Sequence, residues 1–270
     1  PYIPRNILLR YSSPGDTILD YFCGGGTTAI EAKLLGRKCI AIDINEKAVE
    51  LAKKNISFEV NELFSSIYEP EIRVGDARNL SFINDNSIDL ICSHPPYANI
   101  IHYTNGKKGD LSFLNPDSFL KEMEKVAKES YRVLKPGKKC VLLIGDLRQK
   151  KHVIPLGFKL IDVFQKCGFL LKELIIKRQH NCRTTGLWYE NSLKYNFLLL
   201  AHEYLPVFEK PAEKLEKIQE KNIPYCVSQE DLKFSYKKRL PFWETSTVWI
   251  FPSGEFEELL NKNVISRYAK

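Results

Sequence analysis

The chain has 270 residues, 44% of them hydrophobic, so it is long enough to bury a full core. Its formal net charge of +7 is moderately basic and is compatible with a polyanionic partner. No apolar run approaches the roughly 20 residues that a membrane-spanning helix needs. The seven cysteines form no Cys-x-x-Cys pair, which predicts reduced core thiols in a cytoplasmic protein, with neither a metal site nor a disulfide framework.

The first 16 residues are expected to be an entry segment that contains a short amphipathic helix. Ile7, Leu8, Leu9 and Tyr11 supply the apolar side of the helix, and the turn at 12–15 ends it. Both an ordinary N-terminal helix and a segment that covers a ligand fit this pattern.

The most informative stretch is Asp20-Tyr-Phe-Cys-Gly-Gly-Gly-Thr-Thr28. The apolar run 17–19 precedes it and apolar residues at helical spacing follow it, which predicts a strand, a glycine turn and a helix start. Gly24 and Gly26 have no Cβ, so the backbone can turn sharply and approach a ligand closely. One of the two threonines can cap the new helix. Alone, such a turn is a weak signal.

Two carboxylates stand at the ends of the next expected strands. Asp43 ends the strand at 38–44, where an acidic side chain can accept hydrogen bonds from both hydroxyls of a ribose. Helix capping is the alternative role, because a helix is expected from 46 to 55 and loosely on to residue 64. Asp76 lies at the exit of the strand at 72–77, where an Asx-turn is equally compatible.

A second motif, Cys92-Ser-His-Pro-Pro-Tyr97, follows the apolar fourth strand at 87–92. Loops that follow two parallel strands of one sheet meet at its carboxyl edge, where α/β sheets bind their ligands. The two motifs are therefore expected to share one site.

Together, these motifs resemble those of the S-adenosylmethionine-dependent amino-methyltransferases of DNA, which modify cytosine N4 or adenine N6. Residues 20–26 match their cofactor motif, usually Asp-Pro-Phe-x-Gly-x-Gly, with Tyr21 replacing the proline. Residues 94–97 match their catalytic motif, in which Asp, Asn or Ser usually precedes Pro-Pro-Tyr. The resemblance runs from residue 1 to about 209. It implies an α/β, Rossmann-like methyltransferase fold with a mostly parallel, doubly wound sheet and an antiparallel closing hairpin.

The resemblance implies S-adenosylmethionine as the cofactor. In this family, a proline-bearing segment packs over the methionine end of the cofactor, and acidic residues bind its ribose and its adenine amino group. The residues expected to bind it here are Pro4, Asp20, Phe22, Gly24, Gly26, Thr27, Thr28, Asp43, Asp76 and Ala77.

The resemblance also implies how the second motif acts. The first side chain and the carbonyl of the first proline accept hydrogen bonds from the base amino group, which exposes its lone pair, and the tyrosine stacks on the flipped base. The catalytic candidates are His94, Pro95, Pro96 and Tyr97, with Ser93 as a substitute if the loop shifts by one residue. A neutral imidazole can accept such a hydrogen bond and an imidazolium cannot.

The long polar loop at 98–116 is a candidate lid or binding loop. The elements expected after it are a helix at 119–133, a buried strand at 139–146, a basic loop at 148–152, a helix at 154–166, and closing strands at 170–177 and 194–201.

Basic, amide and aromatic side chains in loops are candidates for nucleic-acid contact. The richest loop is 177–189, for which a plain hairpin connection is the alternative. The candidates are Lys107, Lys108, Arg148, Lys150, Arg178, Asn181, Arg183 and Trp188.

The resemblance implies a site-specific methyltransferase acting on double-stranded DNA in a restriction-modification setting, alone or with a second subunit. Cytosine N4 is favoured over adenine N6, because Ser93 is present and the first motif residue is not acidic. Cys92 is expected to be a core residue, which argues against methylation of cytosine at carbon 5. The alternatives are a tRNA guanine-N2 methyltransferase and an inactive cofactor-binding subunit.

The chain is expected to divide at residue 209. Residues 1–209 form the catalytic domain, and 210–270 form an extension whose charged first part and apolar stretch at 241–252 suit target recognition or partner docking.

Overall fold

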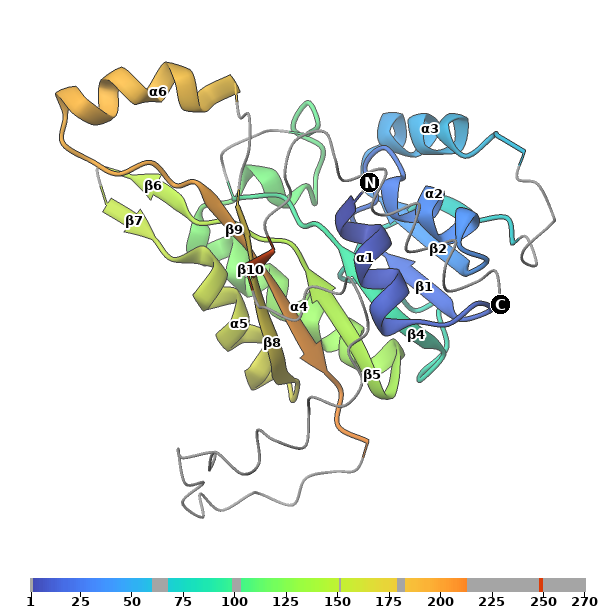
Figure 1. The fold of residues 1–270 in the computed structure, drawn as a ribbon. Helices are drawn as coiled ribbons and strands as arrows, with labels where there is room; N and C mark the ends of the chain where they lie inside the picture. The colour runs from blue at the N-terminus through green and yellow to red at the C-terminus, as the bar shows by residue number, and fades with distance from the viewer. Residues whose placement is uncertain are drawn as a thin grey trace, which may run out of the picture.

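The computed structural model describes residues 2–59, 68–98, 103–150, 152–178, 183–212 and 248–249. A single large sheet runs through the molecule (Figure 1). Its strands are β1 (Thr17–Asp20), β2 (Lys38–Asp43), β3 (Glu71–Val74), β4 (Ile88–Ser93), β5 (Leu134–Leu142), β8 (Leu170–Arg178), β9 (His202–Glu209) and β10 (Val248–Trp249). They lie in the order β10-β8-β9-β5-β4-β1-β2-β3. Strands β5 to β3 pair in parallel, whereas β9 runs antiparallel to both β5 and β8. The predicted fold class is confirmed.

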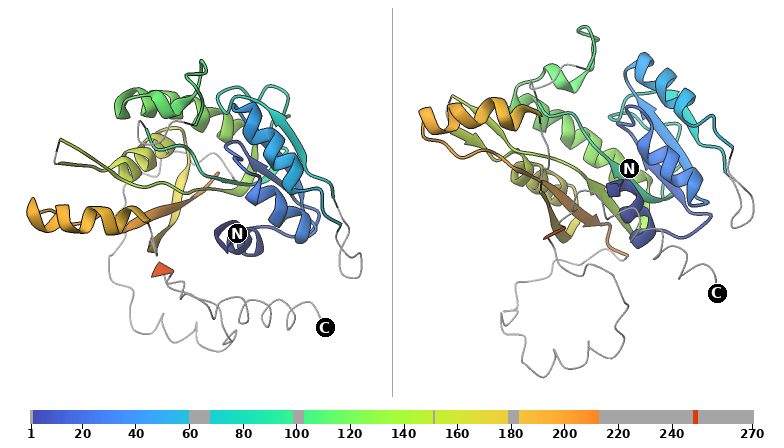
Figure 2. Two further views of the ribbon diagram at one scale, coloured as in Figure 1. Left: turned by 90° about the horizontal axis from the view of Figure 1, so that it is seen from above. Right: turned by 45° about the horizontal axis from the view of Figure 1, so that its top comes forward.

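Helices cover both faces of this sheet (Figure 2). One face carries α1 (Tyr2–Tyr11), α2 (Thr27–Leu34) and α3 (Glu46–Asn55), and the other carries α4 (Pro116–Val133) and α5 (Leu156–Lys166). Successive strand residues point to opposite faces. Ile18 accordingly belongs to the first core and Leu19 to the second, so the sheet is doubly wound. None of the helices described is long and apolar enough to cross a membrane.

The strand predicted at 194–201 is wrong. Residues Arg183–Lys194 form α6, and the strand beside β8 is β9, further along the chain. The apolar run at 194–201 does not pack into the hydrophobic core, since Leu198 is 86% exposed. Val207 and Phe208 of β9 are buried instead. Apolar content alone could not decide which run enters the sheet, because burial is a property of the whole fold.

Two smaller expectations also change. The basic loop predicted at 148–152 is a hairpin of β6 (Leu147–Gln149) and β7 (His152–Ile154), with Lys150 in its turn at a φ of 48°. Helix α3 ends at Asn55, so its expected loose continuation is missing at 56–59. Residues 60–64 of that continuation lie outside the described residues.

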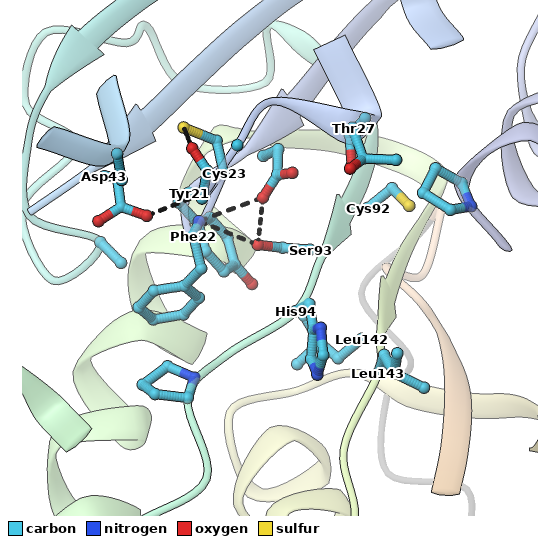
Figure 3. A pocket seen from close by; sticks show the side chains of 18 of the residues that line it. Tyr21, Phe22, Cys23, Thr27, Asp43, Cys92, Ser93, His94, Leu142 and Leu143 are labelled. Carbon is cyan, nitrogen blue, oxygen red and sulfur yellow. Dashed lines mark hydrogen bonds between the residues drawn. The ribbon is translucent and has the colours of Figure 1, made fainter. Parts of the chain in front are cut away.

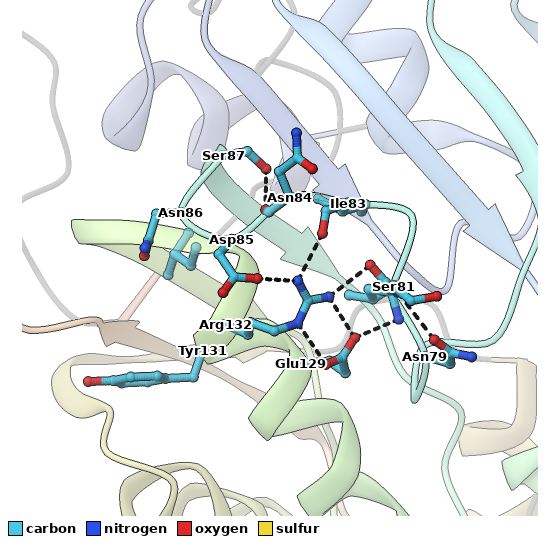
Figure 4. Close-up of polar contacts among 12 residues, drawn as sticks. Asn79, Ser81, Ile83, Asn84, Asp85, Asn86, Ser87, Glu129, Tyr131 and Arg132 are labelled. Carbon is cyan, nitrogen blue, oxygen red and sulfur yellow. Dashed lines mark hydrogen bonds and ion pairs between the residues drawn. The ribbon is translucent and has the colours of Figure 1, made fainter.

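Arg132 of α4 holds the loop that leads into β4. Its guanidinium donates to the Ile83 carbonyl at 2.9 Å and to the Leu80 carbonyl at 2.8 Å (Figure 4). Glu129 accepts from Arg132 and from the backbone N–H of Leu80. These contacts fix the amino end of the strand whose carboxyl end carries the second motif.

The described part of the predicted extension contacts the core. Lys210 is buried, and its ammonium donates to the side chain of Asn86 and to the carbonyls of Tyr131 and Leu134. Val248–Trp249 pairs in parallel with β8. The domain boundary at residue 209 stays a prediction.

Candidate active site

A cavity of about 690 Å³ opens at the carboxyl edge of the parallel strands. Side chains from both sequence motifs face it (Figure 3). Most of the predicted cofactor-binding residues line it: Pro4, Asp20, Phe22, Gly24, Thr27, Thr28, Asp43, Asp76 and Ala77. Of the predicted catalytic residues, Ser93, His94 and Pro96 line it, and Pro95 is buried in the loop. The fold therefore brings the two motifs to one space.

The glycine turn uses two left-handed residues for different purposes. Gly24 has a φ of 48°, donates its N–H to Asp43 at 2.9 Å, and faces open space where a Cβ would meet nothing within 4 Å. Gly26 has a φ of 84° and is the N-cap of α2. A Cβ there would lie 3.0 Å from the Cβ of Ala52 and 3.2 Å from its Cα. Gly26 thus serves close packing of α2 against α3 and is not among the cavity-lining residues.

Asp43 connects the turn to the loop that covers the cavity. One carboxylate oxygen accepts from Gly24, and the other accepts from the backbone N–H of Asn45 at 2.9 Å. The side-chain amide of Asn45 in turn donates to the Tyr103 carbonyl at 2.7 Å. Burial raises the pKa of Asp43 above its usual value. The ribose contact predicted for Asp43 remains a prediction.

Asp20 and Ser93 tie the two motifs together. The Ser93 hydroxyl donates to Asp20 at 2.6 Å and accepts from the backbone N–H of Phe22 at 3.1 Å (Figure 3). Asp20 is only 3% exposed. Burial raises its pKa to about 6, although hydrogen bonds from neighbours oppose the shift. The hydroxyl of Ser93 is therefore engaged with the cofactor motif.

The raised pKa of Asp20 predicts a pH-dependent stability. Between its unfolded pKa of 3.8 and its folded value of about 6, the folded state holds a proton that the unfolded state has lost. The contribution of Asp20 to the free energy of unfolding is thus fully present below about pH 4 and is lost as the pH rises through about 6. The loss amounts to about 3 kcal/mol. The Asp20→Asn variant should gain about that much over the wild type between pH 4 and pH 7, measured by urea unfolding. Parallel curves would contradict the assignment.

Asp76 is already engaged by an arginine. Arg78 donates to its carboxylate from Nη2 at 2.6 Å and from Nε at 2.9 Å, and also pairs with Glu122. Burial would raise the pKa of Asp76, but hydrogen bonds from Arg78 outweigh burial and lower it. Asp76 stays ionised and keeps lone pairs free, so it can also accept from a ligand.

His94 belongs to a chain of four polar side chains. Its Nε2 lies 3.0 Å from the Tyr97 hydroxyl, the hydroxyl donates to Glu203, and Lys177 donates to the second oxygen of Glu203. Sequence reasoning missed Glu203 and did not single out Lys177. The one available signal was a glutamate within the apolar run that becomes β9.

The predicted nucleic-acid residues do not gather in one place. Arg178 lines the cavity, and Lys107 instead pairs at 2.8 Å with Glu46, the first residue of α3. Arg148 donates to the Leu198 carbonyl, and Trp188 is exposed on α6. The remaining candidates are exposed Lys108, exposed Lys150, Arg183 at the start of α6, and Asn181, which lies outside the described residues.

The family model described as DNA methylase matches residues 2–54 and 88–264, which is most of the chain. The chain belongs to the DNA methylase family. Membership implies S-adenosylmethionine as the cofactor, in agreement with the sequence prediction.

Several curated relatives match this chain. It is 36% identical over 96 residues to the tRNA (guanine(10)-N2)-dimethyltransferase of Methanothermobacter thermautotrophicus, which is 36% of this chain and 26% of the relative. It is 25% identical over 211 residues to the type II methyltransferase M.MthZI of the same organism, which is 72% of this chain and 58% of the relative. The chain spans less than two thirds of the length of either relative.

A solved structure shows the same fold. A SAM-dependent methyltransferase from Methanosarcina mazei aligns with a TM-score of 0.53 and 21% identity, covering 77% of this chain and 98% of that one.

The cavity suits the cofactor that the family implies. S-adenosylmethionine carries a sulfonium and an ammonium, and the lining offers the carboxylates of Asp20, Asp43 and Asp76. The backbone at Gly24 leaves open space for a ligand to approach.

Proposed function

We propose that this DNA methylase moves a methyl group from S-adenosylmethionine to the exocyclic amino group of a base flipped out of double-stranded DNA at a specific sequence. The observation that carries the proposal is the shared cavity, in which His94 and the glycine turn face the same space. The bound cofactor would supply the electrophilic methyl group. The protein contributes by holding the amine in line with that methyl, and such positioning lowers the barrier strongly.

The cofactor residues take separate roles in this proposal. Asp43, at the end of β2, accepts from the ribose hydroxyls. Asp76 accepts from the adenine amino group with the lone pairs that Arg78 leaves free. Pro4 of α1 covers the methionine end, which is consistent with its place in the cavity wall.

His94 and the Pro95 carbonyl are the proposed acceptors for the two protons of the base amino group, and Tyr97 stacks on the flipped base. Two prolines in succession restrict φ and lack N–H groups, so they present carbonyls rigidly. We assign the side-chain role to His94 and not to Ser93, because Ser93 is buried and its hydroxyl already donates to Asp20.

Cytosine N4 is the proposed target in preference to adenine N6, because the first motif residue is not acidic. Methylation at carbon 5 of cytosine would need an activated thiolate. Cys92 is 5% exposed and burial raises its pKa well above the usual value, so it cannot serve as that nucleophile.

The proposed DNA-contacting surface starts at the end of β8 beside the cavity and extends to α6. Arg178 ends that strand, α6 comes next in the chain, and the β6–β7 hairpin with Arg148 lies beside α6 (Figure 1). Trp188 is 54% exposed there, and an exposed aromatic side chain suits stacking or wedging between bases.

Tritiated methyl transfer to unmethylated genomic DNA, with total tRNA in parallel, tests the proposed function. The expected product is N4-methylcytosine in DNA, identified by mass spectrometry of the nucleosides. N6-methyladenine would correct the base and keep the class. Label in tRNA alone would overturn the proposal.

The tRNA arm of that experiment has a specific motive. The tRNA (guanine(10)-N2)-dimethyltransferase relative is 36% identical over the part it shares with this chain. Absence of label in both substrates, with the cofactor bound, would indicate a missing second subunit or an inactive binding protein.

A further inference from the structure

The antiparallel direction of β9 places a buried carboxylate beside the second motif. Because β9 runs against β5 and β8, its first residues lie at the carboxyl edge, where β4 ends in Ser93. Glu203 pairs directly across from Lys177 in the β8–β9 register and is 5% exposed. Its two oxygens accept from Lys177 and from the Tyr97 hydroxyl.

The polarity of these hydrogen bonds follows from what each group can donate. Lys177 only donates, and an ionised Glu203 only accepts. Burial would raise the pKa of Glu203, but hydrogen bonds from Lys177 and Tyr97 outweigh it and lower the pKa, so the carboxylate is charged. Tyr97 therefore donates its single hydroxyl proton to Glu203.

The Tyr97 oxygen can then only accept from His94, which is 3.0 Å away. The proton of a neutral His94 must sit on Nε2, and Nδ1 must carry a lone pair. Among the described residues no hydrogen bond to Nδ1 is found, and the His94 ring lines the cavity.

We propose that Glu203, held by Lys177, is a positioning residue that acts through Tyr97 to keep the His94 proton on Nε2 and so presents Nδ1 as the acceptor for the base amino group. This inference rests on the proposed function for its substrate. The tautomer itself is a property of the free protein.

Replacing Glu203 by glutamine should reverse the direction of donation along this series of hydrogen bonds. Lys177 still needs an acceptor, so the amide oxygen turns to Lys177 and the amide NH₂ turns to Tyr97. Tyr97 then donates to Nε2 of His94, and the proton of His94 moves to Nδ1. Nδ1 then carries a proton, so it can no longer accept a hydrogen bond from the base amino group. In a serine protease, the amide replacement of the carboxylate that orients its histidine lowers kcat about 10⁴-fold through the wrong tautomer.

The test is ¹⁵N NMR of ring-labelled histidine in the free protein at pH 8. The chain has five histidines, and the His94→Asn variant identifies the His94 signals by their loss. We expect protonated Nε2 in the wild type and protonated Nδ1 in Glu203→Gln. A matched control is Glu209→Gln on the same strand, where the carboxylate pairs with Lys139 and Lys172 away from His94. It should keep the wild-type tautomer.

Protonated Nδ1 in the wild type, or an unchanged tautomer in Glu203→Gln, would overturn the inference even if methyl transfer to DNA is found. Single-turnover rates on DNA give the second readout. Glu203→Gln should lose at least about 10²-fold in rate at saturating cofactor, with unchanged cofactor affinity and unchanged circular dichroism. A tautomer change without a loss of rate would also count against the positioning role. If the wild type methylates no DNA, the proposed function fails while the NMR result still decides the tautomer.

Discussion

Replacing His94 by alanine is expected to lower the rate of methyl transfer to DNA about 10²- to 10³-fold. The estimate follows from removal of one preorganised polar partner of the reacting group. His94 lies at the cavity and outside both hydrophobic cores, so the fold and the cofactor affinity should be retained. The measurement is a single-turnover rate at saturating cofactor and DNA, with the cofactor Kd from calorimetry.

A second variant distinguishes the acceptor role from mere filling of space. His94→Asn returns an oxygen acceptor at the position where the resembled family usually has Asp, Asn or Ser, so part of the lost rate should return. Equal losses in the alanine and asparagine variants would contradict the acceptor role of His94.

The same role predicts a pH dependence. Partial desolvation lowers the pKa of His94 below 6.5, with Glu203 of β9 opposing and Lys177 of β8 adding to the shift. An imidazolium has no acceptor nitrogen. The wild-type rate should therefore be constant from pH 8 to about 6.5 and fall tenfold per unit below the lowered pKa. The His94→Asn variant should not show this fall in rate at low pH. The comparison therefore distinguishes the titration of His94 from that of Asp20. A wild-type profile that coincides with that of His94→Asn at every pH would refute the prediction.

Replacing Gly26 by alanine is expected to lower the free energy of unfolding by about 2 to 4 kcal/mol. A φ of 84° costs a residue with a Cβ about 1 kcal/mol or more. The new Cβ would also meet Ala52 at 3.0 and 3.2 Å, and the second of these contacts is with backbone, which cannot rotate away. Overpacking of this kind typically costs about 1 to 3 kcal/mol. Urea unfolding followed by circular dichroism measures the difference.

The neighbouring glycine supplies the matched control. A Cβ on Gly25 would meet Asn55 at 3.6 Å and Leu51 at 3.7 Å, which are ordinary contacts, and Gly25 has no positive φ. Gly25→Ala should change the unfolding free energy by less than about 1 kcal/mol. If both variants lose the same stability, close packing at Gly26 is not the reason for the glycine there.

The local patterns of the chain were sufficient for the fold and for the place of the cavity. The glycine turn between an apolar strand and an amphipathic helix is a signal carried by neighbouring residues. Asp43 and His94 follow strand ends, and parallel strands bring such ends together whatever their separation in sequence. The sequence therefore predicted one shared edge before any contact was known.

Other features depended on the tertiary structure, because they join segments whose proximity no local pattern encodes. Two apolar runs, one before 202–209 and one within it, could each have formed the strand beside β8. Burial against α5 and pairing with β8 show that it is the second, β9. Glu203 meets Tyr97 across 106 positions of sequence, since β9 enters the sheet in the antiparallel direction. In the same way, the packing of α2 against α3 at the missing side chain of Gly26 was not predicted, and the ligand contact predicted for Gly26 stays a prediction. Long-range pairing and close packing are set by the assembled sheet, and only the folded chain reveals them.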